Sequence, residues 1–186
     1  MEQLQVKDLT VPLDEYATVS IEATLYEAVL ALEKAQEELD RKRYLYLHRA
    51  VLVLGDGGKV VGKVSQLDVL TALEPKYRQM GQASSISRAG FSPQFLREML
   101  EKFSLYTEPL VDICRKASEL KVKDFMYTPG EGEYVDEQAS LPEAIHQLVM
   151  GHHQSLLVTR GEKIVGVLRL TDVFKEIFRI MKSCEI

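Results

Sequence analysis

The feature that most constrains the fold of this chain is an internal repeat. The tripeptide VKD at residues 6–8 recurs 116 positions later at 122–124, and GKVSQLDV at 62–69 recurs 104 positions later as GVLRLTDV. Such a repeat predicts two similar folding units. The difference between the offsets, 116 minus 104, makes the first copy 12 residues longer, and eleven of these fall within residues 33–48. Because eleven residues are about three helical turns, we expect a helix that lengthens without rotating its buried face.

Both copies predict the element order strand, helix, strand, strand, helix. In the first copy Leu25, Val29, Leu32 and Leu39 have the spacing of one helix face. In the second copy Ser140 is placed to cap a helix whose first turn contains Pro142. Two aliphatic runs across a glycine-containing turn then predict a β-hairpin in each copy. The expected fold is α/β, of the α+β type, with β-α-β-β-α units at residues 1–74 and 120–186.

Residues 75–119 do not repeat and are expected to form a helical connector beside the pair. The small polar stretch GQASSISRAG at 81–90 predicts a loop, and a second short helix is expected around 108–120. A longer helix should begin at Ser92, and one of its faces carries an apolar stripe that is typical of a core or an interface: Phe95, Met99 and Phe103.

Composition narrows the classes of function. A net charge of -5 argues against a nucleic-acid surface, which requires dense positive charge. The two cysteines lack metal-ligand spacing and fit a reducing compartment. The first residues do not resemble a signal peptide, and no aliphatic run is long enough to span a membrane. We therefore expect a soluble cytoplasmic protein that binds neither nucleic acid nor membrane.

The two copies resemble a tandem pair of CBS domains, also called a Bateman module. Each copy has the sequence VKD in a first segment that we call its lead, followed by the β-α-β-β-α unit. The closing turn of each unit has the pattern glycine, any five residues, aspartate and valine. The resemblance covers residues 4–74 and 120–182. It implies that the two units pack their sheets about a pseudo-two-fold axis. It also implies that clefts between the units bind adenosyl ligands and that pairs often form disk-shaped dimers. Members of the family are sensors or regulatory modules and not enzymes.

The resemblance also implies site residues. The motif aspartate binds ribose hydroxyls in the family, and the serine or threonine three positions earlier lies near the phosphate. These positions are Asp68 and Ser65 in the first copy and Asp172 in the second. The base is expected against the chain before the first helix and the start of the second strand, where the candidates are Thr18, Val19, His48 and Ala50, and in the second copy Val135 and Ser155.

The same residues support this chemistry independently, but they also have a purely structural interpretation. A carboxylate accepts hydrogen bonds from a vicinal diol, and free N–H groups at a helix start attract phosphate. Ser65 and Asp68 also have the spacing of a capping box, which would stabilise the helix by about 0.5 to 2 kcal/mol without any ligand. Both interpretations remain open for the first copy.

Arg169 stands in the second copy where the first has Ser65. An arginine cannot cap a helix N-terminus, and its charge is unfavourable there unless an anion neutralises it. We therefore expect Arg169 either to pair with Asp172 or to contact a ligand phosphate. The eleven additional residues enter just before His48, so they could reshape or cover that cleft.

The leading hypothesis is a regulatory module that binds AMP, ADP, ATP or S-adenosylmethionine and signals to an unidentified protein partner, with a homodimer expected. No catalytic residue, metal site or required cofactor is expected, because no nucleophile and base pair or metal-binding motif is visible. The alternative is a ligand-free scaffold or dimerisation module with vestigial clefts.

Overall fold

The computed structural model describes residues 4–74, 76–79, 91–105 and 112–183. Its two units have the expected order of elements. The first contains β2 (Thr18–Ser20), α1 (Leu25–Glu38), β3 (Ala50–Leu54), β4 (Val60–Ser65) and α2 (Gln66–Leu73). The second contains β5 (Tyr134–Asp136), α7 (Leu141–Gly151), β6 (Ser155–Arg160), β7 (Lys163–Arg169) and α8 (Leu170–Ser183). The remaining strand and α-helices of the described residues are β1 (Val11–Pro12), α3 (Lys76–Gln79), α4 (Pro93–Lys102), α5 (Ile113–Glu119) and α6 (Val122–Phe125).

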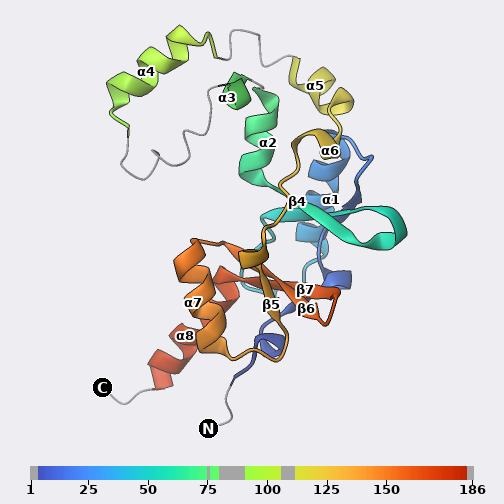
Figure 1. The fold of residues 1–186 in the computed structure, drawn as a ribbon, viewed down its shortest axis with the longest axis vertical. Helices are drawn as coiled ribbons and strands as arrows, with labels where there is room; N and C mark the ends of the chain where they lie inside the picture. Colours follow the sequence, from blue (N-terminus) through green and yellow to red (C-terminus); the bar gives the residue numbers. More distant parts are fainter. Residues whose placement is uncertain (1–3, 75, 80–90, 106–111, 184–186) are drawn as a thin grey trace.

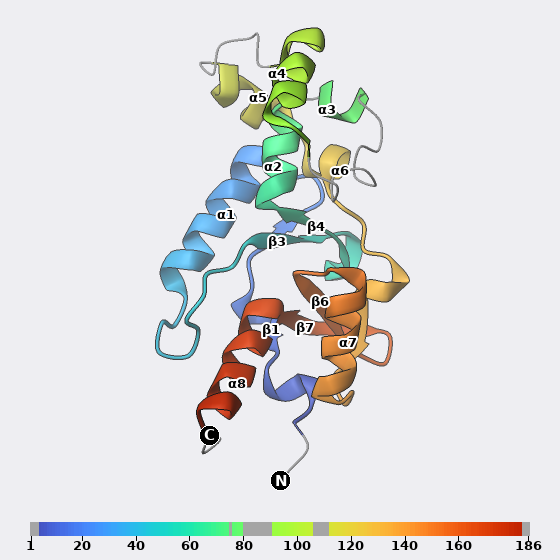
Figure 2. The same ribbon diagram turned by 90° about the vertical axis from the view of Figure 1, so that its left-hand side faces the viewer.

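The two sheets meet in the middle of the molecule, with α1 and α2 at one end and α7 and α8 at the other (Figures 1 and 2). One sheet has the order β2-β3-β4 and the other β1-β7-β6-β5. A hydrophobic cluster joins them, and it draws its side chains from both units: Val11, Tyr16, Leu39, Tyr44, Leu52, Leu157 and Val167. The fold is therefore a mixed α+β pair, as the sequence predicted.

Each VKD lead packs against the opposite unit. Val6 N donates to Ala139 O at 3.0 Å, and Val122 N donates to Ala23 O at 2.8 Å. Farther along, β1 pairs with β7, whereas Tyr127 of the second lead pairs with Lys63 of β4. Equivalent bonds thus recur in both directions, which gives the pair its approximate two-fold symmetry and ties the two units together.

The repeated glycine of the closing turn is required by this crossing. A Cβ atom on Gly166 would lie 2.4 Å from Val11 O, and one on Gly62 would lie 2.7 Å from Met126 Sδ. A side chain at either position would collide with the lead segment that crosses over it. The glycines therefore serve the packing of the units.

The expected lengthening of the first helix is mostly wrong. Helix α1 has 14 residues and α7 has 11, so the helix gains only three of the additional residues. The chain leaves the helix at Leu39, whose backbone is extended and whose side chain is only 8% exposed in the core between the sheets. Burying Leu39 and Tyr44 in that core favours a turn over further helix, and the rest of the insertion forms a loop over residues 39–49, which we call the insertion loop.

The connector helix α4 begins as expected, with the Ser92 hydroxyl accepting a hydrogen bond from Phe95 N at 3.1 Å. Its apolar stripe is not part of the core, because Phe95 is 42% and Phe103 36% exposed. The predicted loop at 81–90 lies outside the described residues. No helix in the described part of the chain is both long and apolar enough to cross a membrane.

Candidate functional site

A cleft of about 510 Å³ lies between the two units; we call it the main cleft. Both units line it. The first unit contributes these residues: Tyr16, Leu47, Arg49, Ala50, Lys63, Ser65, Gln66, Leu67 and Asp68. The second lead and the second unit contribute the others: Tyr127, Glu133, His152, His153, Gln154, Ser155, Arg169 and Thr171.

Ser65 and Asp68 reach the main cleft from the junction of β4 and α2. The Ser65 hydroxyl accepts from Asp68 N at 3.2 Å, and Asp68 Oδ2 accepts from Ser65 N at 2.7 Å and from Ser65 Oγ at 2.6 Å. The capping box is therefore formed. All of these bonds to the carboxylate end on Oδ2, and Asp68 Oδ1 accepts none from the residues that the structure describes. One oxygen of Asp68 holds the helix start, which leaves the other available to a ligand.

Glu133 forms a buried polar centre on the facing wall. It is 3% exposed, pairs with Lys63 Nζ and accepts from Tyr127 Oη at 2.5 Å. Burial alone would raise the pKa of Glu133, but the hydrogen bonds from Lys63 and Tyr127 outweigh it and lower the pKa. The same bond to Glu133 raises the pKa of Tyr127 to about 12.

One unpaired cation, Arg49, and two histidines line the main cleft. The Arg49 side chain is exposed and has no ion-pair partner among the described residues, and His152 and His153 follow the end of α7. Lys63 is neutralised by Glu133. An anionic group would therefore find an unpaired guanidinium and two imidazoles here. No three His, Cys, Asp or Glu side chains gather closely enough to hold a metal ion in the part of the chain described.

The structure divides the candidate residues from the sequence into two groups. Ser65, Asp68, Ala50, Ser155 and Arg169 line the main cleft. The others are not among the lining residues. Val19 and Val135 pack in the cores of the units, and Thr18 pairs with Leu52 in the sheet. His48 is fully buried, and Asp172 forms an ion pair with Arg169. The wall facing Asp68 comes from the second unit because the lead segments cross.

Sequence reasoning missed Lys63, Tyr127 and Glu133. A signal was available for Tyr127, because it lies five residues after the start of the second VKD lead, as Val11 does after the first. These residues reach the cleft because the lead segments cross, and no pattern within a short stretch of the sequence predicts that crossing.

Arg169 pairs with Asp172, which was one of the two expected alternatives. Its Nε donates to Asp172 Oδ2, and its Nη2 donates to Asp172 Oδ1 at 2.8 Å. Its Nη1 donates to Tyr46 O at 3.0 Å and lies 3.2 Å from His48 Nδ1. The guanidinium carbon lies 5.2 Å from the centre of the Tyr44 ring. The insertion loop thus supplies three of the four partners of this buried cation.

His48 makes the stability of this cluster dependent on pH. Burial, followed by the positive charge of Arg169, lowers the pKa of His48 from 6.5 to about 4, against weaker opposing effects of Asp172 and Glu15. Below pH 6.5 the unfolded chain binds a proton that the folded chain refuses, so stability should fall between pH 6.5 and pH 4 and be unaffected by this group above pH 6.5. A shift of 6.5 minus 4 corresponds to a loss of up to about 3 kcal/mol.

We expect His48→Asn to remove this loss, because asparagine can accept the Arg169 hydrogen bond without titrating. Urea unfolding of the wild type and the variant between pH 7.5 and pH 4 measures the difference. His153→Asn is the matched control, since His153 occupies the equivalent place in the second unit, is only half-buried and should leave the slope unchanged. Parallel pH curves for His48→Asn and the wild type would contradict the prediction.

The comparisons with known proteins agree with this geometry. The CBS domain family model matches residues 6–75 and 122–179. No curated protein matches the chain. The chain is similar to a CBS domain-containing protein of unknown function from Bacillus anthracis, with 18% identity, a TM-score of 0.62, and coverage of 95% of this chain and 94% of that one.

Two structures of one plant protein are also similar. CBSX2 in complex with AMP shares 18% identity at a TM-score of 0.57, over 95% of this chain and 98% of that one. CBSX2 from Arabidopsis thaliana, described as a CBS-pair protein, shares 17% identity at the same TM-score, over 98% and 99% of the two chains. At these identities the likeness establishes the fold. Since the family model matches both repeats, the chain belongs to the CBS domain family and consists of a tandem pair of its domains.

Proposed function

We propose that the protein is a regulatory module that binds an adenosyl nucleotide in the main cleft and signals to a partner protein. The observation that carries this proposal is the unused Oδ1 of Asp68, a residue that lines a cleft of about 510 Å³ together with the unpaired guanidinium of Arg49. A carboxylate oxygen can accept from the two hydroxyls of a ribose. The similar structure of CBSX2 in complex with AMP supports a nucleotide of this kind.

The charges of the main cleft favour AMP, ADP or ATP over S-adenosylmethionine. Arg49, His152 and His153 can donate to phosphate oxygens, and Ser65 lies beside them at the start of α2. S-adenosylmethionine instead brings a sulfonium cation toward these groups. Calorimetry with all four compounds tests the order, and saturable binding of S-adenosylmethionine alone would contradict it.

We expect Asp68→Ala to weaken AMP binding by about 100-fold or more, because it removes the charge-assisted hydrogen bonds to the ribose. The variant also loses its capping box, so a loss of stability must be separated from a loss of contact. Glu27→Ala is the matched control: Thr24 and Glu27 form the same box at the start of α1, away from the cleft. Each variant should lose about 0.5 to 2 kcal/mol of stability, but only Asp68→Ala should lose affinity in calorimetry. Equal AMP affinities for the two variants would refute the role of Asp68.

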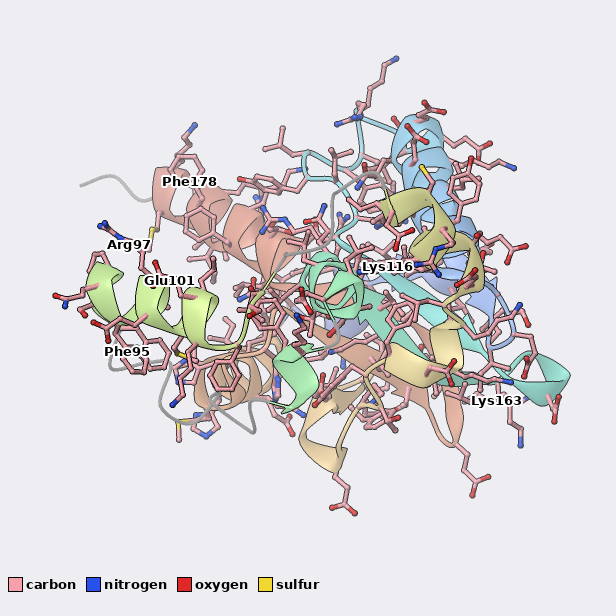
Figure 3. The ribbon with its side chains drawn as sticks, turned by 90° about the horizontal axis from the view of Figure 1, so that it is seen from above. Phe95, Arg97, Glu101, Lys116, Lys163 and Phe178 are labelled. Carbon is pink, nitrogen blue, oxygen red and sulfur yellow. The ribbon has the colours of Figure 1, made fainter. Side chains whose placement is uncertain are left out.

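The second candidate function, a dimerisation module or scaffold, is favoured by exposed apolar side chains on α8. Phe174 is 61%, Phe178 49% and Met181 61% exposed, and Figure 3 shows Phe178 at the outside of the molecule. An apolar face of this kind marks an interaction surface. We propose that a second copy covers it, which is compatible with ligand binding in the main cleft.

We expect the wild type to have twice the mass of one chain in light scattering at micromolar concentration, and Phe178→Asp to halve it by placing a charge in the interface. Phe95→Asp tests the other candidate surface, the stripe on α4, and should leave the dimer intact. A monomeric wild type would contradict the prediction, as would dissociation caused by Phe95→Asp alone.

A further inference from the structure

The approximate two-fold symmetry defines a second cleft, the counterpart of the main cleft. In the two hairpins Ala50 pairs with Ser65 and Ser155 pairs with Arg169, so Arg169 occupies the position of Ser65. Asp172 follows Arg169 by three residues and therefore corresponds to Asp68. The remaining walls correspond likewise: Val11 matches Tyr127 and Ala17 matches Glu133, both at the repeat offset of 116.

The second cleft is closed to solvent. Val11 is 0%, Ala17 4%, Arg169 4% and Asp172 9% exposed. In the main cleft Tyr127 is 44% exposed and Asp68 is half-buried, whereas Glu133 is buried like its counterpart Ala17. Equivalent positions of the two repeats therefore form one open and one filled space.

The filling consists of protein side chains that satisfy the second aspartate. Two N–H groups of the Arg169 guanidinium occupy both oxygens of Asp172, whereas Asp68 keeps one oxygen unused. His48 lies against Tyr16 with 4.4 Å between the ring centres, and Tyr44 lies beside the guanidinium. A ribose that approached Asp172 from this side would have to displace a buried ion pair and part of the insertion loop.

We infer that Arg169 and the insertion loop together close the second cleft from within, so that each chain takes up one adenosyl nucleotide, bound at Asp68. This inference rests on the proposed function of the main cleft. It gives the insertion loop a role, because Tyr44, Tyr46 and His48 belong to it.

A separate cavity of about 440 Å³ is also lined by Asp172. It lies between α8, the first lead and the insertion loop, and its walls include Thr10, Arg43, Tyr44 and Lys175 but neither Arg169 nor Ala17. The cavity therefore shares Asp172 and Tyr44 with the second cleft, but none of the residues that match Ser65, Tyr127 and Glu133 lines it.

Equilibrium dialysis with radiolabelled AMP tests the inference on the intact chain. The wild type should bind one AMP per chain, and Asp68→Ala should bind almost none at an AMP concentration that just saturates the wild type. Arg169→Ser, which installs the residue of the first repeat, combined with Tyr44→Ala, should raise the number to two. Because Arg169 also lines the main cleft, the AMP in the second cleft is identified by adding Asp68→Ala to the double variant, which should then still bind one AMP. Arg160→Ser is the matched control, because Arg160 pairs with Glu137 away from both clefts, and it should bind one AMP.

The outcomes separate the inference from the proposed function. Two AMP per wild-type chain, or one AMP retained by Asp68→Ala, would overturn the closure while leaving nucleotide binding intact. No AMP on the wild type but one on the double variant would support the closure and overturn the proposed function. No AMP on either would overturn both. If the double variant does not fold, one AMP per wild-type chain that is lost in Asp68→Ala still supports the inference.

Discussion

Replacing Gly166 by alanine should destabilise the protein by about 3 kcal/mol, because the added methyl group overpacks a site that cannot yield. The new Cβ atom would lie 2.4 Å from Val11 O and 2.5 Å from Thr10 Cγ2. Val11 belongs to β1, which is hydrogen-bonded to β7, so its carbonyl cannot move without breaking the crossing of the first lead. Thermal unfolding should show a melting temperature lower by about 6 to 12 °C for a domain of this size.

Gly62→Ala is the matched control in the other repeat. There the nearest atom is Met126 Sδ at 2.7 Å, the flexible end of a side chain, and the nearest backbone atom is Tyr127 O at 3.0 Å. Because methionine can rotate away, this variant should lose about 1 kcal/mol or less. Equal losses for the two variants would mean that the crossing of the first lead is not the reason for Gly166.

The fold was predictable because its evidence is local and occurs twice. The hairpins follow from aliphatic runs around a turn, and three helix starts follow from Ser65, Ser92 and Ser140, whose side chains accept hydrogen bonds at the first turns. Ser65 and Asp68 could be placed at the site for the same reason, since a residue at a helix start keeps its position relative to the strand before it.

The rest of the site depends on contacts between residues far apart in the sequence. Lys63 and Glu133 are 70 positions apart and meet because the second lead crosses to the first unit. The repeat offset does not report which unit a lead packs against. Thr18 and Val19, which were expected to contact the base, are not among the residues that line the main cleft. The insertion was predicted to lengthen the helix because its length corresponds to whole helical turns. That length does not reveal that Leu39 and Tyr44 are buried between the sheets, which requires a loop instead of further helix.

The Arg169–Asp172 pair should be the most sensitive polar contact of the protein. Both side chains are almost completely buried, with 5% and 11% of their side-chain surface exposed. Removing one partner of a buried pair leaves the other charge without compensation, and this typically costs about 3 to 5 kcal/mol. Asp172→Asn should therefore destabilise the chain by about that amount in urea unfolding at pH 7.

A double-mutant cycle separates the pair from the packing of its side chains. Arg169→Met keeps most of the side-chain volume without the charge, and the combination of Arg169→Met with Asp172→Asn should be more stable than Asp172→Asn alone, because no uncompensated guanidinium remains. The control is Glu176→Gln on the same helix: Glu176 and Arg179 are also three residues apart, but Arg179 is 68% exposed, so the loss should be below about 1 kcal/mol. If the losses of stability of the two single variants simply add up in the double variant, the ion pair contributes nothing. The side chains that fill the second cleft are then held there by packing alone.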